Sequence, residues 1–294
     1  MKPSSLPKKL PSSARPYLGM GIFAFGFALA LSSSGLELNQ LLDPRAAAVI
    51  WGTTILPAAF LSRQKVPHGK SLLVLSIPAG IICCVVGMHA LLHLGDRELS
   101  GIGANSATML LTVLYSTLIA FLGYMFDHQD KNCSTMLSVK IILVPVLLSV
   151  GTLYWIANGL AESNLVSVTT YFDAEIFLFF IAFFAALTLK NDHREFASNL
   201  ADASIFGMII LIVISLLIWF ASMPSSEVPR NATEIATQGI LYGTFLYMLS
   251  FYLSLVTGEN DEINFGIKNW HLIEITALYI LLVFAPPSIF ELAL

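Results

Sequence analysis

The chain has 294 residues, of which 56% are hydrophobic and 12% are charged, and its formal net charge is −4. Soluble domains carry about 25% charged residues, so this composition excludes an ordinary soluble protein and indicates an integral membrane protein. The sequence contains no basic patch of the kind that binds nucleic acid. Cys83 and Cys84 are adjacent within an apolar run and Cys133 stands alone, so we expect no disulfide.

The sequence predicts an all-α, polytopic membrane protein with about nine transmembrane helices. Residues 1–16 are basic and rich in proline, and we expect them to form a disordered cytoplasmic tail. The second and sixth apolar runs are short for a span of about 20 residues. In chain order, the runs cover residues 17–33, 46–62, 71–94, 104–126, 139–160, 174–189, 203–222, 234–256 and 270–289.

The distribution of basic residues predicts the orientation. With the N-terminus inside, the inner segments hold twelve Lys and Arg residues and the outer segments hold three, Arg45, Arg97 and Arg230. Basic residues favour the cytoplasmic side, so this bias predicts a cytoplasmic N-terminus. The loops are short, and no phosphate-binding loop, dinucleotide fingerprint or zinc-protease motif is present. We therefore expect neither an enzyme nor a bound cofactor.

Two stretches that align without gaps predict an internal repeat. Residues 21–43 align with residues 151–173 at an offset of 130, and Gly80 and Leu114 align with Gly207 and Leu241 at an offset of 127. Four spans return the chain to the same side, so the two units are parallel rather than inverted. We expect a first four-helix unit over 17–130, a second over 131–258 and a C-terminal transmembrane helix within 259–294.

The fourth span carries a polar stripe. Asn105, Thr108, Thr112, Tyr115 and Ser116 recur at helical spacing and so share one helical face. Lipid offers such a face no partner, so the stripe indicates a helix that lines a pore or holds a partner. A packing role, with each hydroxyl bonded to its own backbone one turn earlier, stays open.

Short motifs in the first half resemble the MotA/TolQ/ExbB family of proton-channel proteins. The resemblance covers about residues 17–128 and extends to the second half only through the repeat. It identifies the chain as a divergent, apparently duplicated member. The motifs are Leu42-Asp43-Pro44 with Ile50-Trp51-Gly52-Thr53-Thr54 in the second span, Pro78, Gly80 and Gly87 in the third, and Leu110-Leu111-Thr112-Val113-Leu114-Tyr115 in the fourth.

The resemblance implies a multi-pass subunit of the bacterial inner membrane. In that family the third and fourth spans of a ring of channel subunits face the single-span helices of a second, MotB/ExbD-like protein, which brings the proton-carrying aspartate. Protons or sodium ions, a homo-oligomer and the lipid bilayer are the implied partners. The implied ion-path or partner-facing residues are Cys84, Thr108, Thr112, Tyr115 and Ser116.

The chain departs from the family pattern at several positions. Cys84 stands where the family has a threonine, and Val113 replaces the second threonine of a pair. Leu211 and Gly239 occupy the matching places in the second half. Only about residues 62–70 join the second and third spans, where MotA has a large cytoplasmic domain, so we do not expect the usual flagellar rotor contact.

Two acidic residues at the starts of spans are interpreted as helix caps. Asp43, followed by Pro44, is predicted to be an N-cap, and Asp173 holds the equivalent repeat position. Glu234 and Gln238 form a polar turn in the eighth span, which either guides cations or favours the start of the helix.

Ionisable residues elsewhere give weaker signals. His89 and His93 lie four residues apart but have no evident third ligand, so we predict no metal site. Glu274 follows Lys268 and His271 and is expected at the inner interface, where an ion pair or snorkelling explains it.

These observations predict the channel-like subunit of an ion-motive-force-driven complex, assembled around a single-span partner helix. One alternative is a secondary transporter of a small solute, which would have broken helices and a polar site near the midplane, and the hints of these are Pro57, Pro145 and Asn158. Another is a structural or assembly subunit of a membrane complex that conducts nothing.

Overall fold

In the computed structural model, the described residues are 15–34, 41–94, 99–126, 136–162, 173–190, 195–222, 230–259, 265 and 268–279, and they form helices and turns without a strand. The all-α prediction is confirmed for this part of the chain. A final helix covers residues 268–279. Before it come α1 (Arg15–Ser34), α2 (Pro44–Ile50), the π-helix η3 (Trp51–Ile55), α3 (Leu56–Arg63), α4 (His68–Leu94), α5 (Leu99–Phe126), α6 (Val139–Glu162), α7 (Ala174–Lys190), α8 (Phe196–Ser222) and α9 (Arg230–Thr257).

Four of the helical stretches are long and apolar enough to cross a membrane: Pro44–Arg63, His68–Gly87, Phe196–Ile218 and Thr233–Thr257. Shorter apolar helices lie at Tyr17–Gly26, Leu111–Met125, Val139–Trp155 and Ala174–Leu189. These helices indicate a membrane protein, whereas the number of nine spans stays a prediction. Residues 1–14 of the predicted cytoplasmic tail and the second half of the predicted ninth span lie outside the described residues, whereas Arg15 and Pro16 of the tail belong to α1.

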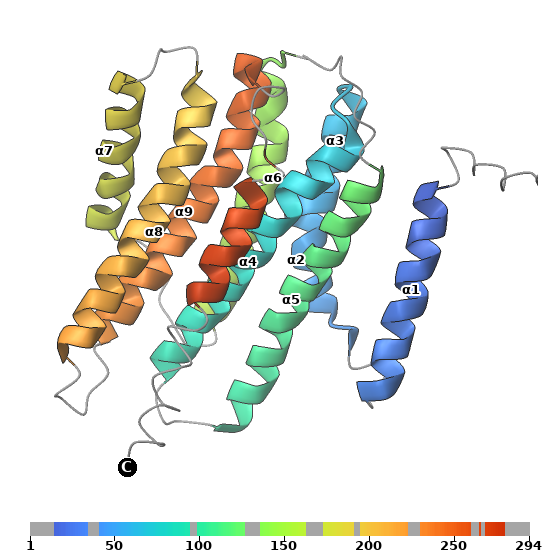
Figure 1. Cartoon of the computed structure of the whole chain (residues 1–294), viewed down its shortest axis with the longest axis horizontal. Helices are drawn as coiled ribbons and strands as arrows, with labels where there is room; N and C mark the ends of the chain where they lie inside the picture. The colour runs from blue at the N-terminus through green and yellow to red at the C-terminus, as the bar shows by residue number, and fades with distance from the viewer. Residues whose placement is uncertain are drawn as a thin grey trace, which may run out of the picture.

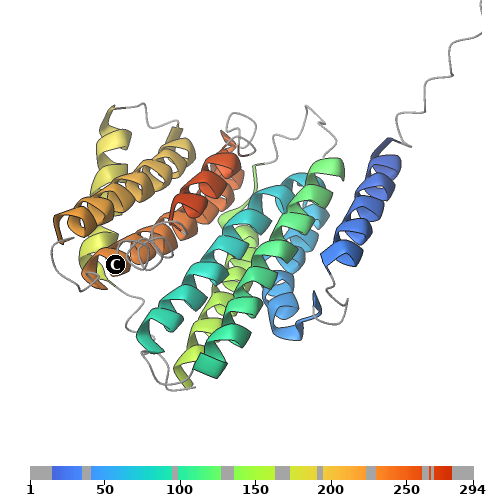
Figure 2. The ribbon, with the colours of Figure 1, turned by 60° about the horizontal axis from the view of Figure 1, so that its bottom comes forward.

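The helices form a layered bundle with α4 near its middle (Figure 1). α4 packs along α5, and α8 packs along α9. Contacts between α4 and α9 join the two halves of the chain. α7 lies at one edge against α8, and α1 lies at the opposite edge against α5. Figure 2 shows the helix of residues 268–279 between α9 and α4.

The distribution of side chains is the one that a lipid environment requires. Large apolar residues point outward from the peripheral helices, such as Leu147 of α6, Leu178 of α7 and Leu217 of α8. Many hydroxyl groups, in contrast, are buried between helices, among them those of Ser71, Ser76, Ser204, Ser215, Ser250 and Ser254. Close packing and hydrogen bonds between helices stabilise such bundles, because lipid tails are as apolar as leucine.

Candidate functional site

The predicted caps at the starts of two helices are present, and each is tied to a tyrosine from another helix. Asp43 Oδ1 accepts from the backbone N–H groups of Arg45 (2.7 Å) and Ala46, so Asp43 is the N-cap of α2. The Tyr115 hydroxyl on α5 donates to the carbonyl of Leu41 and accepts from the N–H of Asp43 at 3.1 Å. The contact fixes the start of α2 against α5.

The second half repeats this arrangement. Asp173 Oδ1 accepts from the N–H groups of Glu175 (2.9 Å) and Ile176 (3.2 Å) at the start of α7. The Tyr242 hydroxyl on α9 accepts from the N–H of Asp173 at 2.5 Å. Tyr242 is the residue that aligns with Tyr115 at the repeat offset.

Three of the predicted ion-path residues of α4 and α5 are enclosed in the bundle, and one of them, Ser116, lies in the interface between these two helices. Thr112, Ser116 and Cys84 are buried. The Ser116 hydroxyl donates to the carbonyl of Val113 at 2.8 Å, and a Cβ on Gly80 would lie 2.5 Å from the Ser116 Cβ. Of the two roles that the sequence left open for Ser116, pore lining and packing, the structure shows packing. No space remains between α4 and α5 at Gly80.

An irregular turn at η3 supplies a second polar region. Pro57, the second residue of α3, has no N–H to donate to the Thr53 carbonyl four residues earlier. The Ser149 hydroxyl of α6 donates to that carbonyl at 3.2 Å, and it lies 3.0 Å from the Tyr252 hydroxyl of α9. A hydrogen-bonded chain thus links η3, α6 and α9, next to the predicted break at Pro57.

The helix of residues 268–279 is held on a surface formed by α4, α8 and α9, which we call the helix-binding surface. Asn269 is bonded at the end where α4 and α8 begin: its Nδ2 donates to the Leu73 carbonyl at 2.9 Å, and its Oδ1 accepts from the Tyr247 hydroxyl at 2.9 Å. Next to it, Lys268 Nζ and Asp202 Oδ1 form an ion pair at 2.5 Å.

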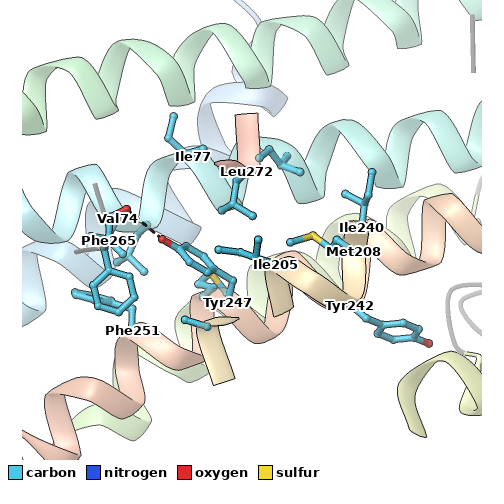
Figure 3. Packing of buried hydrophobic residues seen from close by; sticks show 14 of the residues in the cluster. Val74, Ile77, Ile205, Met208, Ile240, Tyr242, Tyr247, Phe251, Phe265 and Leu272 are labelled. Atoms are coloured by element: carbon cyan, nitrogen blue, oxygen red, sulfur yellow. Dashed lines mark hydrogen bonds between the residues drawn. The ribbon is translucent and has the colours of Figure 1, made fainter. Parts of the chain in front are cut away.

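Further contacts continue along the helix-binding surface. Leu272 lies among Ile77 of α4, Ile205 of α8 and Ile240 of α9 (Figure 3). The Tyr279 hydroxyl lies 2.7 Å from the Thr237 hydroxyl of α9. Three separate helices therefore bind residues 268–279 through an apolar centre with polar contacts at both ends.

Glu274 and His271 lie on the opposite, outward face of this helix. His271 Nδ1 and Glu274 Oε2 are 3.2 Å apart, and both side chains are at least half exposed. Asn269, level with Leu73 of α4, is five residues before Glu274. Glu274 is therefore level with the part of α4 around Pro78.

The remaining predicted residues lie on three different helices. Pro78 and Gly87 are within α4, and Glu234 and Gln238 are half-buried near the start of α9. Thr108 is in α5, but its side chain is outside the described part of the chain, as are the side chains of His89 and His93.

Charged groups are scarce inside the bundle. Among the described side chains, Glu259 is the only charged one that is buried, and its Oε2 accepts from the N–H groups of Ala197 (2.9 Å) and Ser198 (3.1 Å) at the start of α8. The described residues also contain no group of three His, Cys, Asp or Glu side chains that could hold a metal ion.

A comparison of the chain with protein-family models, curated proteins and solved structures finds no match.

Sequence reasoning missed the residues that hold the last helix. Tyr247 and Thr237 of α9 contact this helix. Tyr247 stands with Ser250 and Ser254 at helical spacing, the kind of pattern that drew attention to α5, and it could have been found in the same way. Asn269 and Tyr279 gave no such signal, because their partners lie on other helices.

Proposed function

We propose that the protein is a channel-like subunit of an ion-motive-force-driven membrane complex, built on the MotA/TolQ/ExbB plan. The observation that carries this proposal is that α4 and α9 hold another helix, residues 268–279, between them. α4 is the third span of the first proposed unit and α9 is the fourth span of the second. These are the kinds of span that the resemblance assigns to helix contact.

Equivalent contacts in the two halves support the proposal of two four-helix units. α1 and α2 contact α5, and α6 and α7 contact α9. α3 contacts α4, and α7 contacts α8. The Asp43–Tyr115 and Asp173–Tyr242 contacts join matching positions. Two units with the same internal contacts are expected from a duplicated chain.

The route of the ion is proposed to lie outside the α4–α5 interface. Ser116 fills the space beside Gly80, and its hydroxyl is bonded to the backbone of its own helix. Thr112 and Cys84 are buried in the same bundle. An ion would have to separate the two helices in order to pass there.

A secondary transporter is the second candidate, because of the η3 turn. Two buried hydroxyls, those of Thr54 in η3 and Ser76 in α4, have no hydrogen-bond partner in the described part of the structure. Irregular backbone and hydroxyls between spans are features of the sites where transporters bind ions or solutes. A third role, as a subunit that conducts nothing, fits the closed α4–α5 interface.

The deciding experiment combines native mass with flux. The full chain is extracted in mild detergent, its native mass is measured and all co-purifying chains are identified. The same sample is then placed in lipid vesicles that contain a pH-sensitive or a sodium-sensitive dye, and an electrical potential is applied. An oligomer that carries protons or sodium ions supports the proposal, and a monomer without ion flux contradicts it. Solute uptake would favour the transporter.

A further inference from the structure

We propose that Glu274, with His271 beside it, is a proton-binding site that the chain carries on its own helix at mid-depth in the membrane. The inference rests on the proposed function in that it supplies the protonatable group of that ion-driven subunit. It goes beyond the proposed function because it names a residue outside the predicted ion path.

The depth of Glu274 follows first from contacts with α9. Asn269 is bonded to Tyr247, and Tyr279 lies against Thr237, so the helix of residues 268–279 runs antiparallel to α9. Glu274 is halfway between Asn269 and Tyr279 and is therefore level with residue 242. That position is roughly 18 Å from the start of α9 and 22 Å from its end, at 1.5 Å per residue.

Contacts with α4 give the same depth independently. Asn269 is level with Leu73, and the two helices run in the same direction, because Leu272 lies against Ile77. Glu274 is therefore level with Pro78, roughly 15 Å from the start of α4 and 24 Å from its end. The hydrocarbon core of a bilayer is about 30 Å thick, so a residue about 15 Å or more from both ends of two spans lies near its middle.

The environment of the pair differs from that of an ordinary surface ion pair. The side chains of His271 and Glu274 are 50% and 59% exposed, on the face that points away from α4 and α9. The neighbours on that face are apolar: Trp270, Ile273 and Leu278 are exposed beside them. Ionisable side chains within the membrane are costly, and they mark proton and ion pathways.

The other titratable and charged groups near this helix are already engaged elsewhere. Asp202 of α8 pairs with Lys268. Tyr247 and Tyr279 point into the helix-binding surface, where they bind Asn269 and Thr237, and the buried Cys84 lies close enough to Tyr279 to interact with it electrostatically. Glu274 and His271 are therefore the exchangeable pair on the outward face of the described helix.

The proton step involves one O–H bond. The Glu274 carboxylate takes up one proton at a carboxylate oxygen and becomes a neutral carboxylic acid beside His271. Release of that proton breaks the same O–H bond and restores the carboxylate. The proton comes from one side of the membrane and leaves to the other, as the proposed ion-driven subunit requires.

The test uses dicyclohexylcarbodiimide, an apolar reagent that adds covalently to protonated carboxyl groups, on the full chain in lipid vesicles. Peptide mass spectrometry is expected to find the adduct at Glu274, with a yield that falls as the pH rises. E274Q removes the adduct. Glu175, an exposed carboxylate at the start of α7, is the matched control site, and E175Q leaves the labelling unchanged.

His271 provides a readout that a merely structural pair would not give. His271 Nδ1 lies 3.2 Å from Glu274 Oε2, so H271A is expected to change the yield of the adduct at Glu274. An unchanged yield would remove His271 from the site. Native mass of each variant shows that the fold is retained.

Flux separates this inference from the proposed function. E274Q is expected to lower proton flux at least tenfold, and E175Q to leave it unchanged. Labelled Glu274 in a protein without flux would keep the proton-binding site and contradict the channel function. Flux in a protein that is unlabelled at Glu274 and insensitive to E274Q would overturn the site and keep the function.

Discussion

In both the α4–α5 and the α8–α9 interface, two helices approach each other closely at a glycine. The glycine lies on the first helix of one pair and on the second helix of the other. In the first, the small residue is Gly80 on α4, and Ser116 of α5 packs against it. In the second, the small residue is Gly243 on α9, where a Cβ would lie 2.7 Å from Met208 Sδ of α8. Gly243 aligns with Ser116 at the repeat offset.

This difference shows which residues close packing requires and which residues occur in the first half alone. Both interfaces need a residue without a side chain at one level, and either helix can supply it. The hydroxyls do not recur: Thr112 and Ser116 align with Gly239 and Gly243, and Cys84 aligns with Leu211. Hydroxyls at these positions are therefore not needed for close packing of the two helices.

The largest expected effect comes from a glycine that lacks a counterpart in the second half. A Cβ on Gly123 would lie 2.7 Å from the backbone nitrogen of Leu73 and 2.8 Å from the carbonyl oxygen of Gly69. The aligned position in α9 is Ser250, which is buried without such a clash. Gly123→Ser should lower the free energy of unfolding by about 1–3 kcal/mol or more, since backbone atoms cannot move aside.

Thermal unfolding in mild detergent measures this effect. Gly151→Ser on α6 is the control, because a Cβ there meets nothing within 4 Å. If Gly123→Ser were as stable as Gly151→Ser, the two interfaces would not differ in packing as described.

The tyrosine contacts should give the next largest effect. Tyr115→Phe leaves the Leu41 carbonyl and the Asp43 N–H without the hydroxyl, and Tyr242→Phe removes it from the Asp173 N–H. Each change should cost about 1–2 kcal/mol, the lower part of the range for unsatisfied groups, because both sites are half-buried. Unfolding in a denaturing detergent measures the single and double variants. Costs that fail to add would show that the two contacts are coupled rather than separate copies.

Loss of the caps should be somewhat smaller. Asp43→Ala and Asp173→Ala each remove two side-chain hydrogen bonds at a helix start, which is worth about 1 kcal/mol. Asp→Asn at either position retains an acceptor and serves as the control. Equal losses are expected from thermal unfolding, and a loss at only one position would break the equivalence of the two halves.

Ser116→Ala should have the smallest effect. Its hydroxyl bonds only to the carbonyl of Val113 in the described structure, and that carbonyl belongs to the same helix. The cost should be below about 0.5 kcal/mol, and vesicle flux should not change if ions avoid the α4–α5 interface. A large loss of flux with normal stability would return the ion path to this interface.

The parts of the fold that depend on neighbouring residues could be predicted from the sequence. Asp43 followed by Pro44 predicts a helix start, because both residues act on the N–H groups directly after them. The predicted apolar runs overlap helices wherever the chain is described. The candidate site was predicted less well, since a hydroxyl stripe on one helix cannot distinguish a pore from packing until the facing helix is known.

The sequence by itself determined the membrane class, the helical content and the capped helix starts, because these follow from composition and from spacing within one segment. Only the tertiary structure decided that residues 268–279 bind to α4, α8 and α9, since Asn269 and its partner Leu73 are 196 positions apart. The level of Glu274 along α4 and α9 was decided there too. Spacing along the chain places a residue on its own helix, but contacts with other helices determine its level in the bundle.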